Sequence, residues 1–264
     1  MSISALIDER FRPGDTLIHR LDARTKLLGT LAFVFAATLV PAGRWDGFAL
    51  LALLLATAIA ISRLPLPLVI RRSALALPFL VVAIPLLFTK EGDTLFTIPI
   101  VFWQWHATAA GAEAFGTVMV KSLLSVAAAV VLTTTTRPID LLRALRALGV
   151  PRIIVATVSF MYRYLAVIGE EATRLLRARD CRSVRVGRNS GGSLAWRSRV
   201  LGNMVGSLFL RSYERSERIY EAMTARGFRG ELHSLSTPSF AAVDWSILAS
   251  LAAILVGVET YVRL

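Results

Sequence analysis

Two tripeptides combine a small residue with an arginine near the expected ends of two long helices. They are Ala178, Arg179 and Asp180 in the first copy, and Ala225, Arg226 and Gly227 in the second. A small residue lets a partner backbone approach, and a guanidinium makes forked hydrogen bonds to carboxylates or carbonyls. Two such ends are suited to two similar grooves. The alternative is that Ala-Arg pairs are common in an Ala- and Arg-rich chain and that arginine merely complements the helix dipole.

Residues for other chemistries are missing from the sequence or far apart in it. No G-x-x-x-x-G-K loop is present to bind nucleotide phosphates. The apolar segments contain neither paired carboxylates nor an H-E-x-x-H sequence. His19, His106 and His233 are widely separated, and Cys181 is the single cysteine. We therefore expect no catalytic residues, no metal ligands and no cofactor.

Three helices are expected to position the two tripeptides. They cover about residues 138–148, 153–180 and 194–226. Pro138 suits the first turn of the first helix, because its missing N–H costs nothing there. The second helix is apolar up to Ile168 and charged after Gly169. Gly227 follows the third helix as a natural left-handed cap.

The rest of the chain is dominated by apolar segments. The complete sequence has 55% hydrophobic residues and a mean hydropathy of +0.60, and both values exceed those of ordinary soluble domains. Windows long enough to cross or nearly cross ~30 Å of hydrocarbon lie at about 27–43, 46–62, 73–89, 114–134 and 240–258. Pro78 and Pro85 are expected to bend the third. The pattern predicts an all-α polytopic membrane protein with about five transmembrane helices and a cytoplasmic domain of long helices.

The charges predict how the chain lies in the membrane. Of 30 basic residues 27 are arginines, and they avoid the apolar windows, as membrane topology requires and nucleic-acid binding does not. Residues 137–238 hold 18 arginines against eight acidic residues, so they belong in the cytoplasm with the N-terminus. The acidic, aromatic-rich connection at 89–113 is then outside, with its aromatic residues at the membrane interface, and the C-terminus is outside as well. We expect three regions, 1–136 with four spans, 137–238 as the cytoplasmic domain of long helices, and 239–264 with the last span.

Three segments resemble one known family. Residues 19–28 (HRLDARTKLL) are similar to its opening Asp-Pro-Arg-x-Lys segment, with Ala23 in place of the proline. Residues 138–165 and 213–228 are similar to its cytoplasmic region. The family is the transmembrane T components of energy-coupling factor transporters, in particular the CbiQ branch associated with cobalt uptake.

The resemblance implies a coupling subunit of a bacterial cytoplasmic membrane. In that family, two Ala-Arg-Gly-type signatures dock into grooves on a pair of ATPase subunits. By resemblance this role falls on Ala178, Arg179, Asp180, Ala225, Arg226 and Gly227, with Asp180 at a glycine position. The partners implied are two CbiO-like ATPases, a CbiM-like substrate-binding membrane subunit, a small CbiN-like subunit and membrane lipid, with no nucleic acid. Cobalt or nickel is the expected substrate.

Other functions stay open at this point. A T component that serves a vitamin such as biotin is the nearest alternative. An intramembrane enzyme predicts acidic, His or Ser clusters facing a cavity inside the membrane. A self-sufficient channel or carrier usually has inverted repeats and broken helices. Co-purification distinguishes them, because a coupling subunit brings an ATPase with it.

Overall fold

A computed structural model describes residues 12, 14–74, 77–89, 94–100, 103–182, 193–230 and 242–264. The chain is predominantly α-helical, as predicted. Its contacts group into two compact units. The bundle unit comprises Phe11–Ala144 and Pro238–Leu264, and the paired-helix unit comprises Met1–Arg10 and Leu145–Thr237.

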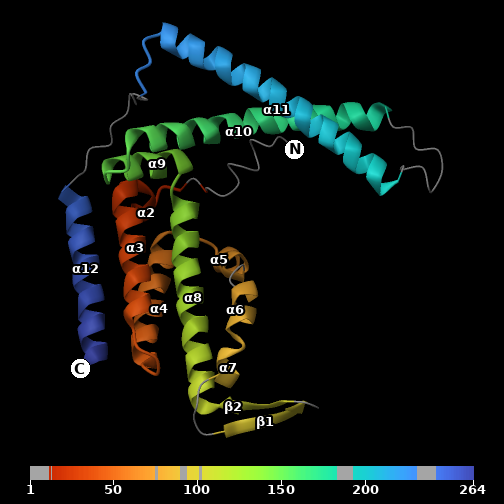
Figure 1. Cartoon of the computed structure of the whole chain (residues 1–264). Coiled ribbons are helices and arrows are strands. Elements are labelled where there is room, and N and C mark those ends of the chain that lie inside the picture. The colour runs from red at the N-terminus through yellow and green to blue at the C-terminus, as the bar shows by residue number, and fades with distance from the viewer. Residues whose placement is uncertain are drawn as a thin grey trace. The chain divides into compact units, whose positions relative to one another are not determined.

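The bundle unit is built around two adjacent helices, α3 and α8. Its helices are α2 (Leu17–Arg20), α3 (Ala23–Leu39), α4 (Trp45–Ile61), α5 (Leu66–Ser73), α6 (Leu77–Ala83), α7 (Leu86–Thr89), α8 (Ala109–Thr135) and α12 (Ala242–Arg263). Helix α3 packs against α8 and α12, while α8 also contacts α4, α5 and α7 (Figure 1). A core of buried apolar residues from α3, α4, α8 and α12, including Phe33, Leu51, Leu124 and Val262, joins these helices.

Three helices in the described part of the chain are long and apolar enough to cross a membrane. They are α8, α12 and α10 (Arg152–Arg182). Helices α8 and α12 match the predicted fourth and fifth spans. Helices α3 and α4 match the first two but have 17 residues each, which is about 25 Å of helix and short of the usual span. Length and composition alone also allow α10 to span, although the sequence analysis places it in the cytoplasm.

The third predicted span is not one continuous helix. Helix α6 ends at Ala83, and α7 begins at Leu86. Pro85 lies at the break. In a continuous helix its ring would clash with a carbonyl of the preceding turn, and its missing N–H removes a helix hydrogen bond. The predicted bend is therefore a break, and neither piece spans a membrane by itself.

An antiparallel hairpin that was not predicted connects α7 to α8. Strand β1 (Thr94–Ile100) pairs with β2 (Trp103–Thr108), with Ile98 opposite Trp105. The β-branched residues of β1 and the two tryptophans of β2 favour strands. The side chains of residues 94–107 lie outside the described ones, so the predicted interfacial role of the aromatics stays a prediction.

A polar cluster ties α12 to the start of α3. The buried carboxylate of Asp244 accepts hydrogen bonds from the backbone N–H of Asp22 at 3.2 Å and from Thr25 Oγ1 at 3.3 Å. Lys26 Nζ donates to the carbonyls of His19 and Thr135, both at 3.1 Å, which joins α2, α3 and the end of α8. Burial and then the Lys26 ammonium lower the pKa of His19, which lies outside the spans.

Close packing of α4 against α12 depends on Gly47. A Cβ at this position would lie 2.5 Å from Cγ2 of the buried Val262. We therefore expect Gly47→Ala to destabilise the bundle by about 1–3 kcal/mol, because overpacking outweighs the helix propensity gained by alanine. Thermal unfolding in mild detergent measures the change.

Gly257→Ala is the matched control, because Gly257 is a helical glycine whose added Cβ would meet no described atom within 4 Å. Its melting temperature should stay equal or rise slightly. Equal melting temperatures for the two variants would contradict the close approach of α4 and α12.

Candidate functional site

The two tripeptides lie on the long helices of the paired-helix unit. Helix α9 (Pro138–Ala147) precedes α10 (Arg152–Arg182), and α11 (Leu194–Ala225) follows it. These bounds agree within two residues with the three predicted helices. The hydroxyl of Ser193 caps the start of α11 by accepting a hydrogen bond from the N–H of Trp196 at 3.2 Å.

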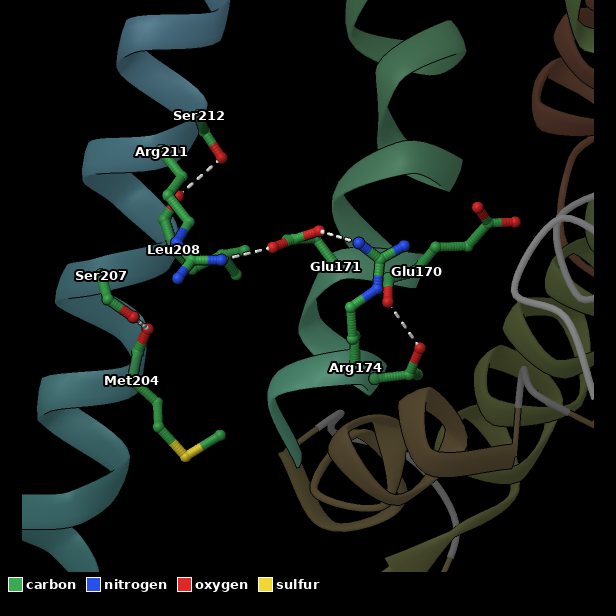
Figure 2. A network of polar contacts seen from close by, with 9 residues as sticks. Glu170, Glu171, Arg174, Met204, Ser207, Leu208, Arg211 and Ser212 are labelled. Atoms are coloured by element: carbon green, nitrogen blue, oxygen red, sulfur yellow. Dashed lines mark hydrogen bonds and ion pairs between the residues drawn. The ribbon is translucent and has the colours of Figure 1, made fainter. Parts of the chain in front are cut away.

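Two contacts show that α10 and α11 cross in opposite directions. Arg211 Nη1 of α11 donates to Glu171 Oε1 of α10 at 2.8 Å (Figure 2). Toward the start of α10, the Phe160 ring meets Phe228, which follows α11, edge to face with centroids 6.0 Å apart. Moving from the first contact to the second runs backward along α10 and forward along α11. The helices are therefore antiparallel where they meet.

An apolar groove lies between the two helices. It has a volume of about 450 Å³ and is lined from α10 by Phe160, Tyr164 and Ile168 and from α11 by Ile219 and Met223. The Glu171 and Arg211 side chains also line it. The groove thus offers a mainly hydrophobic surface with one ion pair and one further arginine, Arg215, a composition suited to another protein rather than to a charged small molecule.

The second tripeptide forms a well-defined helix end. The N–H of Phe228 donates to the carbonyl of Met223 at 3.0 Å, and that of Gly227 to Thr224 at 2.9 Å. With Gly227 at φ +81°, this is a Schellman motif, and the left-handed residue is glycine as predicted. The Phe228 ring then packs on Phe160. Arg226 is exposed, and the helix end that carries it is fixed by the cap hydrogen bonds and by the Phe160–Phe228 contact.

The first tripeptide has a different geometry. Helix α10 continues through it to Arg182, so Asp180 is helical and the tripeptide lies in the last described turn. Arg179 Nε and Nη2 both donate to Asp180 Oδ1, at 3.1 and 2.7 Å. Two of the N–H donors of the Arg179 guanidinium are therefore already bound to the adjacent Asp180. Cys181 beside it is exposed.

The structure does not bring the two arginines together. Arg179 lies eight residues beyond Glu171 on α10, and Arg226 lies fifteen residues beyond Arg211 on α11. Because the helices are antiparallel, the two lie on opposite sides of the crossing. Within the described residues no group of three His, Cys, Asp or Glu side chains is arranged to hold a metal ion, and His233 lies outside those residues.

The sequence analysis missed the contacts that join the two helices. Glu171 and Arg211 are 40 residues apart, and both sit among many other charged residues. The only signal in the sequence is that Glu171 lies near the point where its helix changes from apolar to charged. That signal does not identify its partner.

Comparison with known proteins identifies the family of this chain. The family model described as "CbiQ: Cobalt transport protein" matches residues 14–237. The chain belongs to this family. It is similar to the energy-coupling factor transporter transmembrane protein EcfT 1 of Listeria monocytogenes, at 29% identity over 86% of each chain. EcfT of Exiguobacterium sibiricum is 29% identical over 83% of each chain, and EcfT of Bacillus subtilis 25% identical over 86%.

Family membership decides the class of protein. The chain is a T component of an energy-coupling factor transporter, a bacterial membrane protein that works with ATPase and substrate-binding membrane partners. It is not an enzyme, because partner ATPases hydrolyse the ATP. The alternative of an intramembrane enzyme therefore has no support.

Proposed function

We propose that the paired-helix unit couples an ATPase pair to a cobalt-binding membrane subunit through Arg179 and Arg226. The observation that carries this proposal is the placement of the two arginines in the last described turn of α10 and just after α11, on opposite sides of the crossing. Both Ala178 and Ala225 are exposed, so a partner backbone can approach each arginine closely. One arginine faces each ATPase, in a groove that supplies carboxylate or carbonyl oxygens.

The mechanism is mechanical. When the ATPase dimer binds ATP and closes, its two grooves move toward each other. They then exert force on both arginine-bearing helix ends at the same time. Because α10 and α11 cross, force on their far ends changes the crossing and therefore the shape of the apolar groove between them. The membrane partner contacts this groove, so the change in shape is transmitted to its substrate site.

The membrane topology that this mechanism requires is the one that the charges predict. Residues 137–238 and the N-terminus lie in the cytoplasm, where ATP is, and the C-terminus lies outside. Helix α10 then lies at the cytoplasmic face, although its first half is apolar enough to enter a bilayer. Its charged second half, with Arg179 near its end, favours this placement, since charges inside hydrocarbon are costly.

The finer identities of substrate and partners follow from the family description. Cobalt is the substrate we propose, with nickel as the chemically nearest ion, because the matching family is described as a cobalt transport protein. The partners are then two CbiO-like ATPases, a CbiM-like membrane subunit and a small CbiN-like subunit. Specificity resides in the membrane subunit, since this chain has no three-ligand cluster among its described residues.

Removing the two guanidinium groups should uncouple the complex. We expect Arg179→Ala and Arg226→Ala each to weaken co-purification of the ATPase pair roughly tenfold, because each loses charge-assisted hydrogen bonds. The double variant should lose substrate-dependent ATPase activity altogether. Pull-down from mild detergent followed by ATPase assays measures both effects.

Arg177→Ala and Arg218→Ala are the matched controls, since both are exposed arginines on the same two helices. They should leave ATPase binding unchanged. Full coupling in the Arg179→Ala, Arg226→Ala double variant would overturn the proposed role.

Asp180 should reduce the affinity of the first helix end. Its carboxylate accepts two hydrogen bonds from Arg179, and these must be exchanged when the arginine binds an ATPase. We expect Asp180→Asn and Asp180→Gly to tighten ATPase binding by no more than about fivefold, because exposed ion pairs are weak. Titration of the purified ATPase pair onto the chain in nanodiscs checks this, and weaker binding in both variants would show that Asp180 contributes to docking.

The substrate is tested by uptake. In cells lacking their own cobalt importer, we expect the chain with its ATPase and membrane partners to accumulate cobalt, measured by mass spectrometry of washed cells. The Arg179→Ala, Arg226→Ala double variant should abolish accumulation. Uptake of labelled biotin without any uptake of cobalt or nickel would identify a vitamin transporter instead.

A further inference from the structure

The crossing of α10 and α11 is held by few buried contacts. Among its described residues α11 has none that is buried, and α10 has only Val155 and Ala156, both in its first turns. The hydrophobic effect scales with buried apolar area, so it contributes little to fixing the angle between these helices. Localised contacts must fix that angle.

Glu171 provides such a contact at the crossing. Its side chain is 13% exposed, whereas those of its partners Arg174 and Arg211 are 76% and 59% exposed. One carboxylate oxygen binds Arg211 Nη1 of α11 at 2.8 Å, and the other binds Arg174 Nη1 one turn along α10 at 3.2 Å (Figure 2). Arg174 thus holds the carboxylate on its own helix while Arg211 joins it to the other helix. A half-buried carboxylate with two guanidinium partners is worth more than an ordinary surface pair.

We propose that Glu171 is a positioning residue that sets the crossing angle of α10 and α11 and thereby the placement of Arg179 and Arg226. The Phe160–Phe228 contact is one point of attachment, and helices joined at one point can turn about it. The Glu171–Arg211 pair is the second point and removes this freedom. It acts through the arginines and makes no contact with substrate.

The geometry makes the arginines sensitive to this angle. Arg226 lies only two residues from the Phe160–Phe228 contact, whereas Arg179 lies about 28 Å along α10 from Phe160. A turn of about 10° about that contact moves a point 28 Å away by roughly 5 Å, which displaces Arg179 relative to Arg226. Hydrogen bonds tolerate only a few tenths of an ångström, so such a shift removes the forked contacts of an arginine.

The role in coupling rests on the proposed function, whereas the role in helix geometry does not. Electron–electron distance measurements between spin labels test the geometry directly. Labels are attached at Arg177→Cys on α10 and Glu221→Cys on α11, with Cys181→Ser to remove the native exposed thiol. The full chain is measured in nanodiscs, both alone and with its ATPase pair.

Glu171→Gln should broaden and shift the distance distribution between the labels. Arg211→Glu should have the larger effect, because two carboxylates then repel each other at the crossing. The triple variant Glu171→Arg, Arg174→Glu, Arg211→Glu reverses every charge in the network and should restore the wild-type distribution. A role that depended only on side-chain size would not be rescued in this way.

Glu217→Gln is the matched control, since Glu217 is an exposed glutamate of α11. It should leave the distribution unchanged. An unaltered distribution in both Glu171→Gln and Arg211→Glu would overturn the proposal. Helical content from circular dichroism confirms that each variant is folded, so that a shifted distribution reports the angle.

Coupling gives the second readout. In reconstituted complexes, Glu171→Gln should lower the cobalt transported per ATP hydrolysed about fivefold or more, in the range of typical coupling between sites. Charge reversal should restore it. If the distance distribution shifts but Arg179→Ala and Arg226→Ala have no effect on ATPase binding, the proposed function fails while the positioning role of Glu171 stands.

Discussion

The ion pair between Glu171 and Arg211 is the interaction on which the geometry of the paired-helix unit depends. Few residues of these two long helices are fully buried, so hydrophobic burial alone selects their crossing angle only weakly. A carboxylate shared by arginines of both helices supplies that preference, and Phe228 on Phe160 supplies the second attachment. The unit is therefore held in one arrangement by contacts that a modest force can shift, which is what a mechanical coupling element requires.

The bundle unit, in contrast, is held together by tight packing of buried side chains. Its helices share a continuous apolar core, α4 approaches α12 closely at Gly47, and Asp244 joins α12 to α3. Tight packing makes such a unit resist small deformations. A T component that combines a stiff bundle with a loosely packed pair of long helices confines movement to the helices whose ends carry Arg179 and Arg226.

The sequence predicts the helices better than their contacts. Periodicity, Pro138 and Gly227 locate the three helices of the second half within two residues, because helix ends are set by local chemistry. Pro85 signals a bend, whereas the structure has a complete break between α6 and α7. The β1–β2 hairpin lies in the connection at 89–113, for which the sequence predicted only a position at the membrane interface. Glu171 and Arg211 meet across 40 residues, and no local rule selects this pair from the many charges nearby.

The central claim is that both arginine-bearing helix ends contact ATPase subunits, and site-specific photo-crosslinking tests it most directly. A benzophenone amino acid is placed at Ala178 or Ala225, both exposed and adjacent to the arginines, and at the exposed Val205 as a control. The account predicts a covalent adduct with an ATPase subunit from positions 178 and 225 and none from position 205. Absence of an adduct at 178 and 225, in complexes from which the ATPases still co-purify, would contradict it.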